Sequence, residues 1–388
     1  MNNNRLRKSV GALAVGAVAV VLVLLGSRAQ AQEGASPEAA APKFWEAGAT
    51  VHWNRRAIEL FRARGGNAGR TNAYVALAQY RAVLAARADA SGPPHASPAA
   101  ASAGAALTVL KQFYPLDAAT LEGEIAAQRS AAGWSGEKRK DFAKGEAIGR
   151  AIGAAVLAEA ATDNFGATNP GVPPVGPGYW VSSGAPIVRG GLGARPFFLD
   201  YGGELLAPPP PAFGSAAYLA ALAEIRNLSD NRTPEQLAIA AKWVPFSGVV
   251  LNGVATDLIV RHRRNELDAA RILAYANTAA YDAIIGCFYS KFHYWFIRPS
   301  QADPGITTPL GLPNHPSYPS AHSCETGAFQ EILGAEFPSE RRMLAEVADE
   351  ASTSRFYAGL HYRFDGDAGL ELGRNAARIA LARRGLED

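Results

Sequence analysis

The sequence predicts an all-α protein that is built from two packed helical bundles. Apolar residues recur at steps of three and four residues in most segments, for example over 72–88, and this spacing places them on one face of a helix. The sequence has no convincing run in which apolar and polar residues alternate, the pattern that would indicate a strand. A segment rich in proline and glycine, residues 164–213, divides the helical patterns into two groups and predicts a long connector.

The amino terminus has the three parts of a secretory signal peptide, which we place at residues 1–31. Three cations precede an apolar core at 10–25, and residues 29–31 (Ala-Gln-Ala) form a cleavage site of small residues. The protein is therefore expected to be secreted or periplasmic. The apolar run is close to membrane-spanning length, so an uncleaved membrane anchor is the alternative. No later run reaches that length, so no stable span is expected after cleavage.

The mature chain is expected to begin with a disordered linker at 32–42, which is rich in alanine, proline, serine and glutamate. An N-terminal helical bundle follows at 43–163, and a C-terminal bundle occupies 214–388. Within the first bundle, three glycines recur at four-residue spacing in a long helix (Gly145, Gly149 and Gly153). Such small residues predict a close approach to a neighbouring helix.

The net charge bears on the class of partner, and the cysteine content bears on disulfides and zinc. Removing the four cations of the signal peptide from the formal net charge of +3 leaves −1, so nothing indicates nucleic acid, and we expect a small-molecule substrate. The sequence does not give the oligomeric state. Cys287 and Cys324 are either bridged in an oxidising compartment or two free buried thiols, and two cysteines exclude a cysteine-based zinc site.

The first of three chemically equipped clusters contains Lys291 and Arg298. Both stand near the end of a predicted helix, and Pro299 favours an extended conformation at Arg298. A guanidinium matches two oxygens of a tetrahedral oxyanion, and an ammonium adds a point charge. Alone, the pair also fits an ordinary helix end that carries cations near its carboxyl terminus.

The second cluster is Pro-Ser-Ala-His at 319–322. Proline followed by a helix start leaves backbone N–H groups unpaired at the helix amino terminus, which attracts anions. Ser320 is expected to cap the helix and to donate its hydroxyl to a bound anion, and His322 lies in the first turn. Alone, the motif also fits a capped helix with an incidental histidine.

The third cluster joins Arg355 to His361 and Asp365. The histidine and the carboxylate are four residues apart, so we expect them to share one face of a helix that follows a break at Gly359. The carboxylate accepts the ring N–H of His361 and fixes its tautomer, which leaves the opposite nitrogen as a nucleophile or a metal ligand. Alone, this also fits a surface histidine–aspartate pair.

Together the clusters read Lys-x6-Arg-Pro, Pro-Ser-x-His and Ser-Arg-x5-His-x3-Asp. This order resembles the signature of the superfamily of type 2 phosphatidic acid phosphatases and vanadium-dependent haloperoxidases. The resemblance implies that Lys291, Arg298 and Arg355 hold the equatorial oxygens, aided by Ser320 and the N–H of Ala321. The family usually has glycine in place of Ala321; alanine keeps the N–H group but would be strained at a positive φ.

The same resemblance assigns the catalytic roles. His322 would be the general acid–base, and Asp365 would orient His361. His361 would be the covalent nucleophile of a phosphatase or the axial vanadium ligand of a haloperoxidase.

Flanking residues bear on the branch of the superfamily. Asp282, the Pro-Gly-Tyr-Trp of 177–180 and the pattern over 232–243 resemble haloperoxidases. His315 stands where haloperoxidases place a halide-tuning residue and resembles the forms that oxidise bromide or iodide; it also fits an ordinary loop histidine. The spacers between the clusters are short, with 31 residues between His322 and Ser354, and this is typical of phosphatases.

We therefore expect an exported vanadate-dependent haloperoxidase that oxidises halide with hydrogen peroxide. The alternative is an acid phosphatase without a metal cofactor, which hydrolyses phosphate monoesters through a phosphohistidine at His361. A third hypothesis is a non-catalytic phosphate-binding protein with a relict site, for which Ala321 is the only support.

Overall fold

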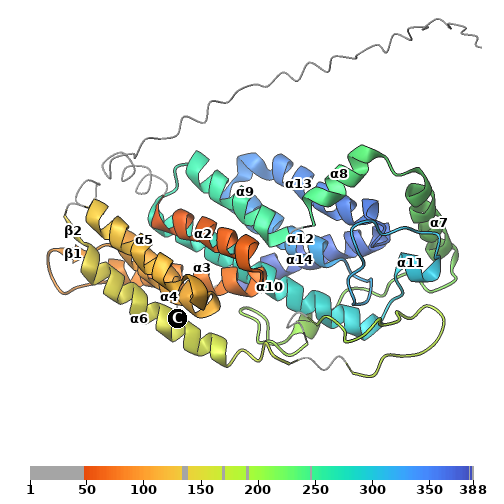
Figure 1. Ribbon diagram of the computed structural model, residues 1–388, viewed down its shortest axis with the longest axis horizontal. Helices are drawn as coiled ribbons and strands as arrows, with labels where there is room; N and C mark the ends of the chain where they lie inside the picture. Colours follow the sequence, from red (N-terminus) through yellow and green to blue (C-terminus); the bar gives the residue numbers. More distant parts are fainter. Residues whose placement is uncertain are drawn as a thin grey trace, which may run out of the picture. The chain divides into compact units, whose positions relative to one another are not determined.

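The described part of the chain is helical along most of its length, as the sequence predicts (Figure 1). The computed structural model describes residues 48–132, 139–167, 171–188, 192–244, 247–383 and 385–386. The α-helices are α2 (Ala49–Arg64), α3 (Ala68–Arg87), α4 (Pro98–Phe113), α5 (Ala118–Ala131), α6 (Phe142–Ala161), α7 (Ala216–Asn231), α8 (Pro234–Lys242), α9 (Ser247–Arg261), α10 (Glu266–Tyr294), α11 (Pro299–Ala302), α12 (Ala321–Glu336), α13 (Arg341–Tyr357) and α14 (Arg363–Arg383).

Short elements complete the fold. The 3₁₀ turns are η1 (Pro115–Asp117), η3 (Gly202–Leu205) and η4 (Pro338–Glu340). Two strands of two residues each, β1 (His95–Ala96) and β2 (Lys140–Asp141), pair in parallel. The prediction of an all-α fold is confirmed for the described residues.

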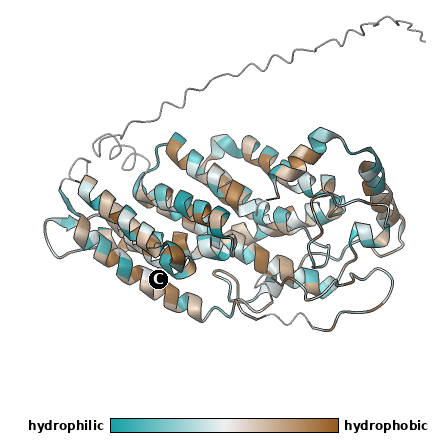
Figure 2. Cartoon of the chain, viewed as in Figure 1, coloured by the Kyte–Doolittle hydropathy of each residue, from teal (hydrophilic) through white to brown (hydrophobic). Residues whose placement is uncertain are grey.

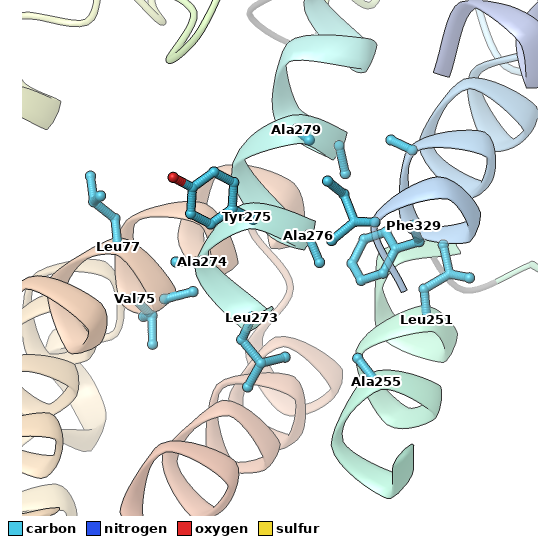
Figure 3. Packing of buried hydrophobic residues seen from close by; sticks show 14 of the residues in the cluster. Val75, Leu77, Leu251, Ala255, Leu273, Ala274, Tyr275, Ala276, Ala279 and Phe329 are labelled. Carbon is cyan, nitrogen blue, oxygen red and sulfur yellow. The ribbon is translucent and has the colours of Figure 1, made fainter. Parts of the chain in front are cut away.

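Helix α10 is the centre of the core. It is 29 residues long and begins after Asn265, whose side chain accepts the N–H of Asp268. Most of its residues are buried, and it packs against α3 on one side and against α12 and α14 on another. Figure 3 shows Leu77 of α3 on one side of α10 and Phe329 of α12 on the opposite side. Since Lys291 stands in its last turn, the core helix fixes the base of the predicted site.

The glycines of α6 allow α4 and α6 to approach closely, and the packing prediction is confirmed. A Cβ atom on Gly149 would lie 2.0 Å from the carbonyl oxygen of Ala101, and one on Gly145 would lie 2.2 Å from that of Ser97. Both distances are far inside van der Waals contact, so larger residues would force the two helices apart. Hydrophilic and hydrophobic residues are interleaved along the helices (Figure 2), in keeping with one buried and one solvated face on the outer helices such as α13.

The proline- and glycine-rich segment is tied to α10 and to the loop that follows it. The N–H of Trp180 donates to the carbonyl of Trp295 (2.7 Å), and the N–H of Ile297 donates to the carbonyl of Gly178 (3.0 Å). Further along, both carboxylate oxygens of Asp282 accept backbone N–H groups of the segment, at 2.8 Å each. The connector therefore braces the loop that carries Arg298. The predicted boundaries of the two bundles remain a prediction.

The predicted signal peptide and linker lie outside the described residues, as does the alternative of an amino-terminal anchor. Among the described residues, no single helix has both the length and the apolar composition to cross a membrane, although the bent pair α8 and α9 passes by those two criteria together.

Candidate active site

The three clusters converge on one cavity of about 570 Å³. Five of the predicted site residues line it: His315, Ala321, His322, Arg355 and His361. Apolar side chains from five parts of the chain form much of the remaining wall (Phe61, Val244, Ile284, Leu310, Leu312 and Leu360). The other predicted residues are fully buried and are tied by hydrogen bonds to the cavity wall or to its supporting loop (Lys291, Arg298, Ser320 and Asp365).

The predicted pairing of His361 with Asp365 is confirmed, but its structural basis was wrong. The ring Nδ1 lies 2.9 Å from the Asp365 carboxylate, with both side chains buried. Helix α14 begins only at Arg363, so His361 precedes the helix instead of sharing its face. The break is at Gly359, as predicted: its φ is +76°, and a Cβ there would lie 2.2 Å from the carbonyl oxygen of Thr307. Glycine is therefore required at this turn.

The electrostatic surroundings hold His361 neutral. Burial lowers the pKa of His361 well below its usual value, and the positive charges of Arg298 and Lys291 lower it further. Burial raises the pKa of Asp365 to about 7, against the hydrogen bond from Ser317 and those same two charges. Neutral imidazole has one N–H, and because the guanidinium of Arg298 can only donate to Nε2, that proton is on Nδ1, which faces Asp365. The lone pair of His361 is therefore on Nε2.

Arg298 is the cation that contacts His361 Nε2. Its Nη1 lies 3.1 Å from this nitrogen and 2.8 Å from the carbonyl oxygen of Leu360. The backbone at Arg298 is extended, with ψ 149°, as Pro299 predicts. Burial lowers the pKa of Arg298 to about 10. An arginine with that pKa stays charged at neutral pH, so the site contains a desolvated positive charge next to the histidine.

His315 is a second hydrogen-bond partner of the Arg298 guanidinium. Its Nδ1 lies 3.0 Å from Nη2 of Arg298, and its backbone carbonyl accepts from Nε of Arg298 at 3.0 Å. Its ring meets that of Phe288 edge to face, with centroids 5.2 Å apart. The residue is thus a buried part of the cavity wall, and its halide-tuning role stays a prediction.

Lys291 occupies a different position from that of a simple oxyanion ligand. Its Nζ donates to the backbone carbonyls of Pro316 (2.9 Å), Ser317 (2.8 Å) and Pro319. Burial lowers the pKa of Lys291 to about 8. These bonds hold the loop that precedes α12 against α10. In this conformation Lys291 therefore supports the loop of the site instead of facing the cavity. Its predicted contact with oxyanion oxygens is not tested by this arrangement.

The amino end of α12 has the features of an anion site. Ser320 is the N-cap residue, as predicted, but its side chain makes no capping bond. Its hydroxyl is buried and has no hydrogen-bond partner among the described residues. Ala321 is the first helical residue and is not among the described residues with positive φ, so alanine is unstrained there. A buried hydroxyl without a partner is costly and implies a ligand or a water.

The hydrogen-bond partners of His322 and Arg355 were not predicted from the sequence. Nε2 of His322 lies 2.9 Å from the carbonyl oxygen of Trp243, and Nη2 of Arg355 donates to that of Ala240 at 2.6 Å. Burial lowers the pKa of Arg355 to about 10, so it remains a cation at neutral pH. Both acceptors are backbone atoms, which any residue supplies, and therefore no sequence pattern marks them.

The two cysteines are free and buried in this structure. The thiol of Cys287 lies 3.7 Å from the carbonyl oxygen of Pro319, directly behind the site. Of the two alternatives that the sequence left open, the structure has the unbridged one.

The described residues contain no group of three or more histidine, cysteine, aspartate or glutamate side chains arranged to hold a metal ion. The cavity is instead lined by three histidines, Arg355 and the first residues of α12, and Arg298 contacts His361 from the protein interior. That set of donors suits a tetrahedral oxyanion better than a bare cation.

Comparison with known proteins bears on the fold. No family model matches the chain, and no curated protein matches it. Among solved structures, a bacterial vanadium-dependent iodoperoxidase is similar with a TM-score of 0.71 and 22% identity, over 87% of this chain and 97% of that one. The apo form of a bacterial vanadium-dependent chloroperoxidase has a TM-score of 0.61 at 15% identity, over 82% and 94% of the two chains. The holo form of such a chloroperoxidase has a TM-score of 0.59 at 14% identity, over 90% and 95%.

The chain therefore has the fold of the vanadium-dependent haloperoxidases, as its motifs predict. Nearly the whole length of those proteins is matched, so the likeness includes helices on both sides of the connector.

Proposed function

We propose that the protein is a vanadate-dependent haloperoxidase, which uses hydrogen peroxide and a proton to convert halide into hypohalous acid and water. The observation that carries the proposal is the arrangement around His361. Its Nδ1 is bonded to Asp365 and its pKa is far below the usual value, so Nε2 presents a lone pair at neutral pH. A single imidazole nitrogen of this kind, beside two arginines and a helix amino terminus, fits the ligand set of an oxyanion centre.

The residues present fit vanadate on three counts. The orphaned hydroxyl of Ser320 supplies a hydrogen bond that nothing in the described chain takes up. The first N–H groups of α12 have no carbonyl within the helix to accept them. Arg298 keeps its positive charge against His361, and Arg355 keeps its positive charge in the wall of the same cavity. When bound, vanadate supplies a Lewis acid that activates peroxide toward halide.

Each side chain then has a definite task. His361 would hold vanadate through Nε2, and the Arg298 N–H group that donates to this nitrogen would then be available to an oxyanion oxygen. Asp365 holds the Nδ1–H of His361 and so fixes the ring. His322 donates Nε2–H to the carbonyl of Trp243, and its proton exchange therefore takes place at Nδ1.

The acid phosphatase alternative uses the same residues, so one experiment must test both reactions. Purified protein is assayed for halide oxidation with peroxide, before and after loading with vanadate, and for hydrolysis of p-nitrophenyl phosphate. A haloperoxidase will oxidise halide only after loading and will be inhibited by phosphate. Halide oxidation that stays at background after loading would refute the proposal, and ester hydrolysis inhibited by vanadate would establish the phosphatase.

We also propose that the protein is exported, on the strength of the charged, apolar and small-residue parts of 1–31. Amino-terminal sequencing of the protein from its native host tests this. A mature chain that begins at Gln32 supports cleavage. A membrane-bound chain that retains its first residues supports the anchor instead.

A further inference from the structure

The carboxyl end of α8 contacts two residues of the candidate site. Its carbonyl groups accept hydrogen bonds from the cavity residues Arg355, through Ala240 (2.6 Å), and His322, through Trp243 (2.9 Å). Arg355 belongs to α13 and His322 to α12, so one short helix end connects side chains from two other helices.

Helix geometry explains why this end is suited to the task. The last carbonyls of any helix lack N–H partners within the helix, and they carry the negative end of the helix dipole. The last turn of α8 is tighter than an α-helix, because the N–H of Val244 donates to the carbonyl of Ala241, three residues earlier, instead of that of Ala240. The Ala240 carbonyl is thereby left for Arg355. A guanidinium and an imidazole N–H are good partners for such carbonyls.

The position of this helix end is set by a side chain of α13. Nε1 of Trp243 donates to Oε1 of Glu350 (2.8 Å), and Nζ of Lys242 lies 2.5 Å from the same oxygen. The Trp243 side chain is fully buried, so it has one well-defined place. Glu350 and Arg355 both belong to α13, five residues or about 1.4 turns apart. Helix α13 therefore holds the end of α8 at two points, through Glu350 and through Arg355.

We propose that Glu350 is a positioning residue for the site, an inference that rests on the proposed function. Through the indole of Trp243, Glu350 fixes the carboxyl end of α8. The carbonyl of Trp243 then keeps a proton on Nε2 of His322 and assigns proton exchange to Nδ1. The carbonyl of Ala240 meanwhile orients the guanidinium of Arg355 toward the cavity. Glu350 itself does not line the cavity.

Three variants test the proposal: Glu350→Ala, Glu350→Gln and the control Glu336→Ala. Glutamine keeps an oxygen for the indole N–H, whereas alanine removes it. Glu336 also links two helices, because its carboxylate binds Arg271 of α10 at 2.6 and 2.8 Å, and it does so at the far end of α12. Its replacement by alanine therefore reproduces the loss of an interhelical carboxylate without touching the site.

The readouts are kcat and KM for the reaction that the wild type catalyses, the affinity for inorganic phosphate by calorimetry, and the melting temperature. Glu350→Ala is expected to lower kcat about 10-fold and to weaken phosphate binding about 5-fold, since two hydrogen bonds of the site lose their geometry. Glu350→Gln should stay within about 3-fold of the wild type for both, in keeping with one retained acceptor. Glu336→Ala should lose stability but neither kcat nor phosphate affinity.

Wild-type kcat and affinity in Glu350→Ala would overturn the proposal, as would an equal loss in Glu336→Ala. A spectroscopic signature separates positioning from general loosening: ¹⁵N chemical shifts should report Nε2–H for His322 in the wild type and a mixture of tautomers in Glu350→Ala. If the wild type catalyses neither reaction, the proposed function fails. Phosphate affinity and the tautomer would still decide whether Glu350 positions this site.

Discussion

A histidine–carboxylate pair lies near each end of helix α12, and the two pairs have different surroundings. At the amino end His361 meets Asp365 at 2.9 Å, and at the carboxyl end His262 meets Glu340 at 2.8 Å. The side chains of the first pair are 6% and 0% exposed, and those of the second are 30% and 18% exposed. The distances are equal within the spread of ordinary hydrogen bonds. Burial and neighbouring charge therefore distinguish the two pairs.

The difference in burial changes the chemistry of the two pairs. At the buried end desolvation and two cations keep His361 neutral, and a guanidinium lies on its second nitrogen. At the exposed end, the hydrogen bond from His262 lowers the pKa of Glu340, and the ring rests on Phe337. The second pair is a partly exposed hydrogen bond, and an exposed polar pair of this kind contributes little free energy. A histidine–carboxylate pair thus becomes a candidate site only where the fold removes water.

The largest expected difference between the two ends is in turnover. His361→Ala should lower kcat at least about 1,000-fold because it removes the only atom assigned to ligation or nucleophilic attack. His262→Ala should leave kcat within about 2-fold, as expected for a partly exposed pair outside the cavity. The kcat of both variants is measured for whichever reaction the wild type catalyses, halide oxidation or ester hydrolysis. Melting curves confirm that the variants are folded. Turnover retained in His361→Ala would place the chemistry elsewhere, and the comparison of the two ends would lose its basis.

The cations at the two ends should respond differently to pH. The pKa of Lys291 is lowered to about 8, below its value of 10.5 in an unfolded chain, whereas Glu336 raises that of Arg271. Between pH 8 and 10.5 the unfolded chain therefore binds one more proton at Lys291, and the free energy of unfolding rises with pH. From pH 8 to pH 10 the wild type should gain up to about 3 kcal/mol relative to Lys291→Met.

Urea unfolding of the wild type and of both variants at the two pH values provides the measurement. Arg271→Met should follow the wild-type pH dependence, since Arg271 does not titrate in this interval. If Lys291→Met does so as well, the lowered pKa of Lys291 is wrong.

The carboxylates should also differ. Asp365→Asn should lower kcat about 10- to 100-fold, because an amide no longer stabilises the Nδ1–H tautomer of His361 as a carboxylate does. Glu340→Gln should leave kcat unchanged. Steady-state kinetics across pH 5 to 8 will show the effect, and an unchanged kcat in Asp365→Asn would mean that the ring is oriented by Arg298 instead.

The smallest effect concerns a capping serine. Ser320→Ala removes a buried hydroxyl that has no partner, so stability should be unchanged or slightly higher, while phosphate affinity should fall about 10-fold. Ser97 is the N-cap of α4 and accepts the N–H of Ala100 at 3.0 Å. Ser97→Ala should give the opposite result, a loss of about 1 kcal/mol with unchanged affinity. Melting curves and calorimetry on the two variants decide whether Ser320 serves a ligand or the helix.

Much of the site was predictable because it rests on local rules. Proline after Arg298 predicts its extended backbone, and Ser320 before a helical pattern predicts an N-cap position; both are confirmed. The four-residue spacing of His361 and Asp365 predicted their contact but not the conformation that produces it. Gly359 ends the preceding helix in a left-handed turn, and His361 reaches the carboxylate from that turn. A short spacing can be bridged by more than one backbone path.

The sequence by itself determined the helical fold, because helix periodicity and capping depend on neighbouring residues, and its motifs named the candidate oxyanion-binding residues in their order along the chain. Only the tertiary structure decided three further points. The ammonium of Lys291 faces backbone carbonyls, the cysteines behind it are unbridged, and the end of α8 holds His322 and Arg355. Each of these depends on backbone atoms or side chains brought together from distant segments. Such contacts leave no pattern in the sequence, because they form only when the helices pack around α10.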